Sequence, residues 1–192
     1  HVLTPEQIML HGKRPPGERV VVYDAEGYTV GPGVAELLAR EGAAVELVTP
    51  LAQVAPVCDQ TLEGPMLRAR LHEAGVVLRR DVTVTAIEPG TVGAEDEFGG
   101  PLELAADAIV LVTRRSSDDA LYHELATDRE ALAAEGIAGL YRIGDCVAPR
   151  LCADAIFDGH RLAREIDADD PSVPLPYRRE RALVGAAVGI IS

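Results

Sequence analysis

The sequence has no run of apolar residues long enough to cross a membrane, which takes about 20 in succession. Its first residues also lack the basic-then-apolar pattern of a secretory signal. Basic residues are few: 18 Lys and Arg stand against 31 Asp and Glu, for a net charge of −13. Because nucleic-acid phosphates repel an acidic chain, we expect a cytoplasmic protein with neither nucleic acid nor membrane among its partners.

Cysteine is scarce as well, and the three residues at positions 58, 146 and 152 match no C-x-x-C metal or redox signature. The five histidines are scattered, without an H-E-x-x-H pair. We therefore expect no metal site, and thiols that stay reduced and pack as small apolar residues. The chain begins with His1 instead of methionine, so we expect a fragment, a processed chain or a trimmed piece.

Apolar residues make up 47% of the chain, enough for a core, and their pattern predicts an α/β fold. The apolar run Val20–Tyr23 predicts a strand over 19–24, the Ala- and Leu-rich segment 32–40 a helix, and residues 43–49 a second strand. Together these form a βαβ unit with a parallel strand pair. Residues 107–113 hold an apolar run, Ala108–Val112, that is rich in β-branched residues, as in a buried central strand.

Other segments complete this predicted domain. The N-terminus predicts a short helix with Thr4 as N-cap, Pro5 in its first turn and Gln7 completing a capping box. A helix is expected over 61–75 and a short strand over 76–80. Pro-Gly and Gly-Gly turns between residues 82 and 106 predict an antiparallel meander.

The rest of the chain predicts a second region. We expect a helix over 118–136, a strand over 139–145 and a long helix over 149–167, followed by a Pro-rich tail on the surface at 168–180. Asp154 and Asp158 are one turn apart on the long helix and should repel each other, so we expect both to be solvent exposed.

The turn after the first strand has the outline of a dinucleotide-binding turn with its glycines misplaced. The G-x-G-x-x-G slots fall on Asp24, Glu26 and Thr29, and Glu26 puts a carboxylate where a pyrophosphate should lie. We expect a fold that no longer binds NAD(P)H. Two alternatives stay open: a phosphate nest at Gly31 and Gly33, or a plain βαβ scaffold.

A second candidate site lies between the strand and the long helix of the second region. Gly144 permits close backbone approach, and Asp145 at a strand end can accept hydrogen bonds from sugar or ribityl hydroxyls. The N-terminus of the next helix then offers N–H groups and a positive dipole end to a pyrophosphate.

These segments resemble those of a known family. The sequence is similar to the C-terminal part of trimethylamine dehydrogenase and its relatives among the NADH:flavin oxidoreductases, including dimethylamine and histamine dehydrogenases and the 2,4-dienoyl-CoA reductase group. The matching residues are LTPEQ (3–7), RVVVYDAEGY (19–28), LAREGAAVELVT (38–49), TLEGPMLRARLHEAGV (61–76), IVLVTRRS (109–116) and YRIGDCVAPRLCADAIFDGHRLAREID (141–167).

The resemblance implies a fold and a domain organisation. Family members carry an N-terminal TIM barrel with FMN and an iron–sulfur cluster, followed by two domains of the glutathione-reductase type. Residues 1–17 would be a helix and linker, and residues 18–112 a Rossmann-like, NAD(P)-binding-like domain with a degenerate glycine motif. Residues 113–192 would be the C-terminal half of an FAD/ADP-binding-like domain and a tail. The barrel of the same polypeptide would be the partner of this chain.

The resemblance also assigns residue roles. Gly144 and Asp145 match the flavin- or ADP-binding Gly-Asp pair. Thr113 and Arg115 match a Thr-Gly-Arg crossover beside the nucleotide, although Arg114 stands in its glycine slot. Arg150 would pair with a phosphate or with a carboxylate at the domain interface. No catalytic residue and no metal ligand is assigned to this chain.

The expected function follows from the degenerate turn. Amine-dehydrogenase-type members have lost the glycine-rich turn, and their electrons leave through the iron–sulfur cluster to an electron-transfer flavoprotein. This chain would then be a structural and ADP or FAD half-site domain without its own catalytic centre. The alternatives are the NAD(P)H-binding domain of a 2,4-dienoyl-CoA-reductase-like enzyme and a docking module for an electron carrier protein.

Overall fold

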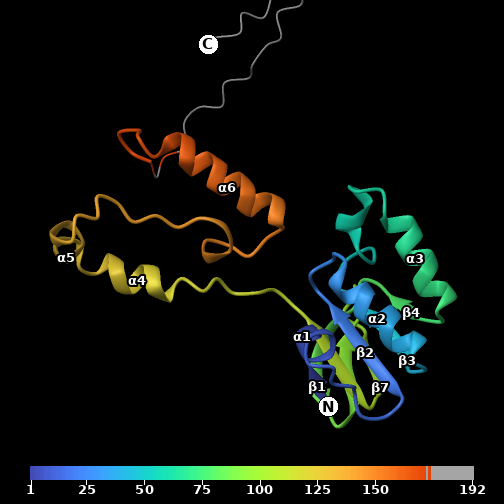
Figure 1. Ribbon diagram of the computed structural model, residues 1–192. Coiled ribbons are helices and arrows are strands. Elements are labelled where there is room, and N and C mark those ends of the chain that lie inside the picture. Colours follow the sequence, from blue (N-terminus) through green and yellow to red (C-terminus); the bar gives the residue numbers. More distant parts are fainter. Residues whose placement is uncertain (172, 174–192) are drawn as a thin grey trace, which may run out of the picture. The chain divides into compact units, whose positions relative to one another are not determined.

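The computed structural model describes residues 1–171 and 173. The chain divides into two compact units, His1–Arg114 and a second unit that begins at Arg115. Both can be followed by colour in Figure 1, where the first runs from blue to yellow-green and the second from yellow to red.

The first unit is built on a five-stranded parallel sheet with the strand order β1-β8-β2-β3-β4. A parallel sheet is covered on both faces, so its central strands are apolar along their whole length. This explains the β-branched runs in β2 and β8 and confirms the predicted α/β class with a parallel sheet. The strands are β1 (Val2–Leu3), β2 (Arg19–Asp24), β3 (Ala44–Val48), β4 (Val77–Arg79) and β8 (Ala108–Val112).

Alternate residues of β2 point to opposite faces of this sheet. Val20 and Val22 belong to the core formed with α1 (Pro5–Met9), α2 (Val30–Arg40) and α3 (Gly64–Glu73). Val21 belongs to a second core on the other face, together with Val92 and Leu104. Three layers result: helices, the parallel sheet and a small antiparallel sheet.

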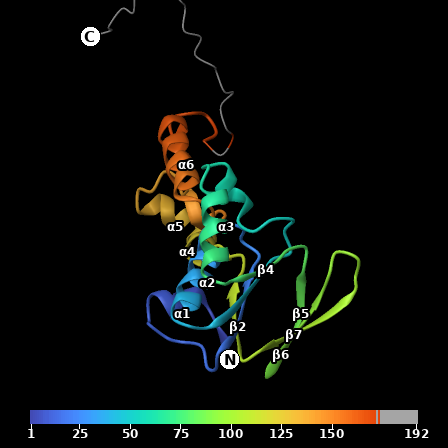
Figure 2. The same cartoon turned by 90° about the vertical axis from the view of Figure 1, so that its right-hand side faces the viewer.

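The antiparallel sheet has the order β5-β6-β7 and is the predicted meander. Its strands are β5 (Thr83–Glu88), β6 (Gly90–Glu95) and β7 (Pro101–Ala106). Figure 2 shows these strands set apart from the three helices.

The N-terminal capping box is confirmed. The Gln7 N–H donates to Thr4 Oγ1 at 3.4 Å, and the Thr4 N–H donates to Gln7 Oε1 at 3.2 Å. Strand β1, just before this helix, was not predicted, because two residues are too short for a period-2 pattern. Its pairing with β8 joins the N-terminus to the sheet.

The second unit differs more from the prediction. The single helix expected over 118–136 is two helices, α4 (Ala120–Ala126) and α5 (Arg129–Ala134). The break occurs where the Asp128 carboxylate accepts the N–H of Ala131 at 2.8 Å and caps α5. A 3-10 turn, η2 (Gly144–Cys146), and the long α6 (Cys152–Glu165) follow.

The strand predicted over 139–145 is wrong. Ile143 is extended, with φ −143° and ψ 162°, but the described residues of this unit form no strand. A strand needs a neighbour to take up its N–H and C=O groups, and the described residues of this unit supply none. The tail predicted over 168–180 falls mostly outside the described residues.

Candidate functional site

The turn after β2 is organised around Asp24, the last residue of that strand. The Asp24 carboxyl is fully buried, and its Oδ1 accepts the N–H groups of Glu26 and Gly27, each at 3.0 Å. Burial raises the pKa of this carboxyl, while the Gly27 and Glu26 N–H groups oppose the rise. The turn thus donates its backbone N–H groups to a side chain of the same chain.

The alternative nest at Gly31 and Gly33 lacks one of its two glycine donors. Helix α2 begins at Val30, two residues earlier than predicted, so both glycines lie inside its first turn. The Gly33 N–H donates to the Thr29 carbonyl at 2.9 Å and is used within the helix. A nest requires successive N–H groups that point together at a ligand.

The end of β3 offers no acidic side chain for a ribose. Thr49 is buried there, and its Oγ1 accepts the Leu51 N–H at 3.2 Å. In a dinucleotide fold this position carries an acid for the ribose 2′-hydroxyl.

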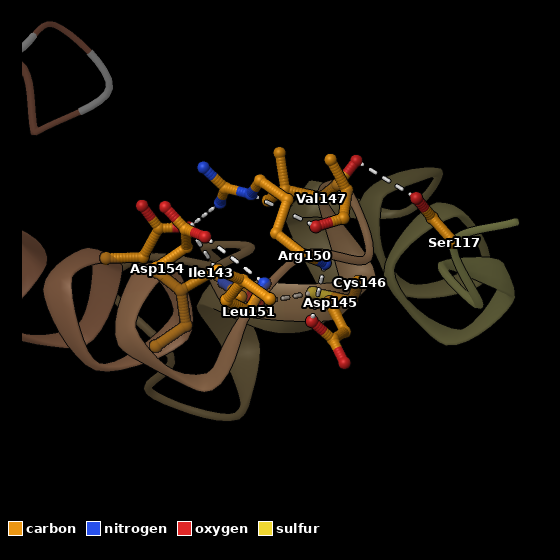
Figure 3. Close-up of polar contacts among 11 residues, drawn as sticks. Ser117, Ile143, Asp145, Cys146, Val147, Arg150, Leu151 and Asp154 are labelled. Carbon is orange, nitrogen blue, oxygen red and sulfur yellow. Dashed lines mark hydrogen bonds and ion pairs between the residues drawn. The ribbon is translucent and has the colours of Figure 1, made fainter. Parts of the chain in front are cut away.

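The Gly-Asp loop of the second unit is shown in Figure 3. Gly144 is buried with φ +62°, a left-handed conformation that favours glycine, and its N–H donates to Asp158 Oδ2 at 3.1 Å. Asp145 is exposed, and its Oδ1 accepts the Arg150 N–H at 3.4 Å. Its carboxylate can therefore still accept donors such as ribose or ribityl hydroxyls.

Arg150 is held by helix α6 and by the loop. Its Nη2 pairs with the Asp158 carboxylate, and its Nε donates to the Ala148 carbonyl at 3.2 Å. Of the two partners considered for Arg150, the structure supplies a carboxylate, and that carboxylate lies within the same unit.

The expectation that Asp154 and Asp158 are solvent-exposed neighbours is wrong. The Asp158 side chain is only 14% exposed and binds both Gly144 and Arg150. Asp154 Oδ2 accepts the Leu151 N–H at 3.2 Å at the start of α6. The two carboxylates accept hydrogen bonds from different backbone N–H groups. Their spacing in the helix predicts repulsion between them and does not identify these partners.

The crossover residues fall on either side of the division between the units. Thr113 is exposed just beyond β8 in the first unit, and Arg115 begins the second unit. Within the second unit the structure groups Gly144, Asp145 and Arg150 in one loop. Ser117, which sequence reasoning missed, ties the segment after Arg115 to this loop, because its hydroxyl donates to the Val147 carbonyl at 3.0 Å.

The loop fits a hydroxyl-bearing ligand better than a bare phosphate. Asp145 supplies an exposed acceptor, whereas the nearby guanidinium of Arg150 is already paired with Asp158. Asp154 in the first turn of α6 also places a negative charge at the positive end of that helix.

Neither a metal-binding cluster nor a membrane-spanning helix is found in residues 1–171 and 173. No cluster of three or more His, Cys, Asp or Glu side chains within this range is arranged to hold a metal ion. No helix within it is both long and apolar enough to span a membrane. Of the thiols, Cys58 is buried as predicted, but Cys146 is half-buried and Cys152 is exposed.

Known proteins are similar to this chain in sequence. Residues 3–126 match the family described as the OYE-like second alpha/beta domain. The chain is 36% identical to dimethylamine dehydrogenase of Hyphomicrobium sp. (strain x) over 206 residues, covering 97% of this chain and 28% of that protein.

Solved structures agree. Histamine dehydrogenase from Rhizobium sp. 4-9 superposes with a TM-score of 0.84 at 38% identity, covering 93% of this chain and 28% of that one. The 6-hydroxypseudooxynicotine amine oxidase from Pseudomonas geniculata N1 gives a TM-score of 0.74 at 38% identity, covering 83% and 23%. This chain thus spans about a quarter of the length of these relatives.

The family match ends at residue 126, whereas the matches to dimethylamine and histamine dehydrogenases cover more than nine-tenths of the chain. The chain belongs to the family of the OYE-like second alpha/beta domain, and its homologues include dimethylamine and histamine dehydrogenases, which are members of the trimethylamine dehydrogenase group of NADH:flavin oxidoreductases.

Proposed function

We propose that this chain is the C-terminal, nucleotide-binding-like part of an iron–sulfur flavoprotein amine dehydrogenase. The observation that carries the proposal is the 36% identity to dimethylamine dehydrogenase over 97% of the chain. In this role the chain is a structural domain and an ADP or FAD half-site in the cytoplasm. FMN and the iron–sulfur cluster belong to a TIM barrel of the same polypeptide, and electrons pass to an electron-transfer flavoprotein.

The chemistry of the two candidate sites supports this assignment over NAD(P)H use. In the first unit the turn N–H groups are taken by Asp24, Gly33 is used inside α2, and β3 ends on a buried threonine. In the second unit Asp145 keeps an exposed carboxylate that can orient a ribose or ribityl hydroxyl. Bound there, the nucleotide would serve as a structural ligand.

The second unit also has the features expected of half a domain. Its extended Ile143 lies in no sheet among the described residues, and α6 exposes Ile156 and Phe157 at 67% and 65%. Large apolar side chains at such exposure indicate a surface that another element covers. We infer that the other half of an FAD/ADP-type domain of the glutathione-reductase kind, from the same polypeptide, covers it.

The test is a turnover assay on the complete polypeptide that contains this chain. We expect dimethylamine or histamine to reduce its flavin, with electron-transfer flavoprotein as acceptor and no oxidation of NADH. Oxidation of NADH coupled to reduction of an enoyl-CoA, without amine turnover, would instead support the reductase-type alternative.

A variant pair tests the half-site. Asp145→Ala should lower the ADP or FAD content of the purified enzyme at least tenfold, because it removes the exposed acceptor of the loop. Asp118→Ala changes an exposed carboxylate of the same unit and should leave that content unchanged. Equal nucleotide content in the two variants would contradict the role of Asp145.

A further inference from the structure

The Asp24 side chain occupies the place where a dinucleotide fold receives phosphate. In such folds the backbone N–H groups of the turn and the start of the next helix face the pyrophosphate. Here the turn N–H groups of Glu26 and Gly27 both donate to Asp24 Oδ1. The carboxylate is an anion, so it offers these donors the same kind of partner that a phosphate oxygen would.

The same side chain also fills the space beside helix α2. A Cβ atom on Gly31, in the first turn, would stand 2.6 Å from Asp24 Cγ and 2.8 Å from Asp24 Oδ2. Only a glycine at position 31 leaves room for the carboxyl. Asp24 therefore lies between the turn and the start of the helix, where a ligand phosphate would have to sit.

The second carboxyl oxygen supports the assignment independently. Asp24 Oδ2 is buried and has no hydrogen-bond partner among the described residues. A buried polar atom without a partner normally costs free energy and calls for an explanation. The positive end of the α2 dipole lies beside it, and no side chain caps that helix at Thr29.

We propose that Asp24 is a built-in anionic ligand of the turn, and that its occupancy is what excludes nicotinamide dinucleotides from the first unit. This inference rests on the proposed function, because it treats the turn as a nucleotide site that has been lost. Glu26, at the second glycine slot, adds repulsion from a second carboxylate, whose Oε2 is also buried.

The test compares two double variants of the 192-residue chain. They differ only in whether the side chain at position 24 fills the space beside helix α2. Both carry Glu26→Gly, which removes the second carboxylate. Asp24→Asn then keeps the volume and the acceptor oxygen but removes the charge, whereas Asp24→Gly empties the space. NADH is titrated into each by calorimetry, with the unchanged chain and Glu26→Gly alone as references.

We expect the Asp24→Gly double variant to bind NADH at least tenfold more tightly than the Asp24→Asn double variant and Glu26→Gly alone. Equal binding by both double variants would show that charge excludes the nucleotide, and binding by Glu26→Gly alone would assign the exclusion to Glu26. The absence of NADH binding by a folded Asp24→Gly double variant would also overturn the proposal. NADH binding by the unchanged chain would instead contradict the proposed function.

Hydrogen exchange gives a readout that needs no nucleotide. The Glu26 and Gly27 amides should exchange at least tenfold faster in Asp24→Gly than in the unchanged chain, and stay protected in Asp24→Asn. Exchange of these amides that does not respond to Asp24→Gly would rule out Asp24 as their partner. If Asp24→Gly fails to fold, Asp24→Ala, which is smaller than aspartate and has no side-chain acceptor, replaces it in both measurements.

Discussion

Asp107 shows how one side chain joins two strands of the parallel sheet. Its Oδ2 accepts the N–H groups of Glu18 at 3.1 Å and Arg19 at 2.9 Å, and its Oδ1 pairs with Arg19 Nη2 at 2.6 Å. Gly17 leaves room for it, since a Cβ there would stand 2.4 Å from the Asp107 Cβ. The carboxylate therefore connects the start of β2 to the residue that precedes β8.

The pH dependence of this contact can be predicted. The hydrogen bond from the Arg19 side chain, followed by that from the Arg19 N–H, holds the pKa of Asp107 well below its usual range. A depressed pKa in the folded state adds stability above the unfolded pKa of about 4, and this stability is lost as the pH falls. Asp107→Asn should therefore lower the melting temperature at pH 7, by an amount that shrinks between pH 5 and pH 3.

Thermal unfolding followed by circular dichroism measures this difference. Glu103→Gln, which changes an exposed carboxylate on β7, is the matched control and should show no such trend. A loss in Asp107→Asn that is the same at pH 7 and pH 3 would mean that the Asp107 charge is not what stabilises the contact.

At the scale of elements, α6 and the Gly-Asp loop depend on Asp158. This helix residue binds the Gly144 N–H and Arg150, although both precede the helix in the chain. Asp158→Ala should cost about 1–3 kcal/mol of unfolding free energy, because it leaves a buried N–H without its acceptor. The hydrogen-exchange rate of the Gly144 amide should also rise in this variant.

The control for Asp158 is Asp169→Ala, an exposed carboxylate beyond the end of α6. It should leave both the unfolding free energy and the Gly144 exchange rate unchanged. An Asp158→Ala variant that loses stability without faster exchange at Gly144 would show that the carboxylate acts elsewhere in the helix.

At the scale of the whole molecule, the two units differ in how much core they hold. All the buried apolar side chains of the described residues lie between Leu3 and Val112, in the first unit. Residues 1–114 produced alone should therefore unfold cooperatively, with a midpoint within a few degrees of that unit in the complete chain.

A truncated control sharpens this prediction. Residues 13–114 lack β1 and α1, which bury Leu3 and Ile8 in the core beside β8. Scanning calorimetry should show a clearly lower midpoint for residues 13–114 than for residues 1–114. Equal midpoints would mean that β1 and α1 are not part of the folding unit.

The sequence by itself determined the elements whose signal is local. Period and composition were enough for β2, α2, β3, β8 and the meander, and the capping box at Thr4 was read from four residues. Motif matching was enough to identify the family. It also singled out Gly144, Asp145 and Arg150 as candidate site residues.

Tertiary structure alone decided which groups meet across the chain. The pairing of the two-residue β1 with β8, the Asp158 contacts and the burial of Asp24 against Gly31 all join groups that hydrophobic periodicity does not connect. The strand predicted over 139–145 failed for the same reason, since extended backbone becomes a strand only beside a partner. A sequence pattern reports which face of an element avoids water, whereas the identity of the partner depends on how distant segments pack.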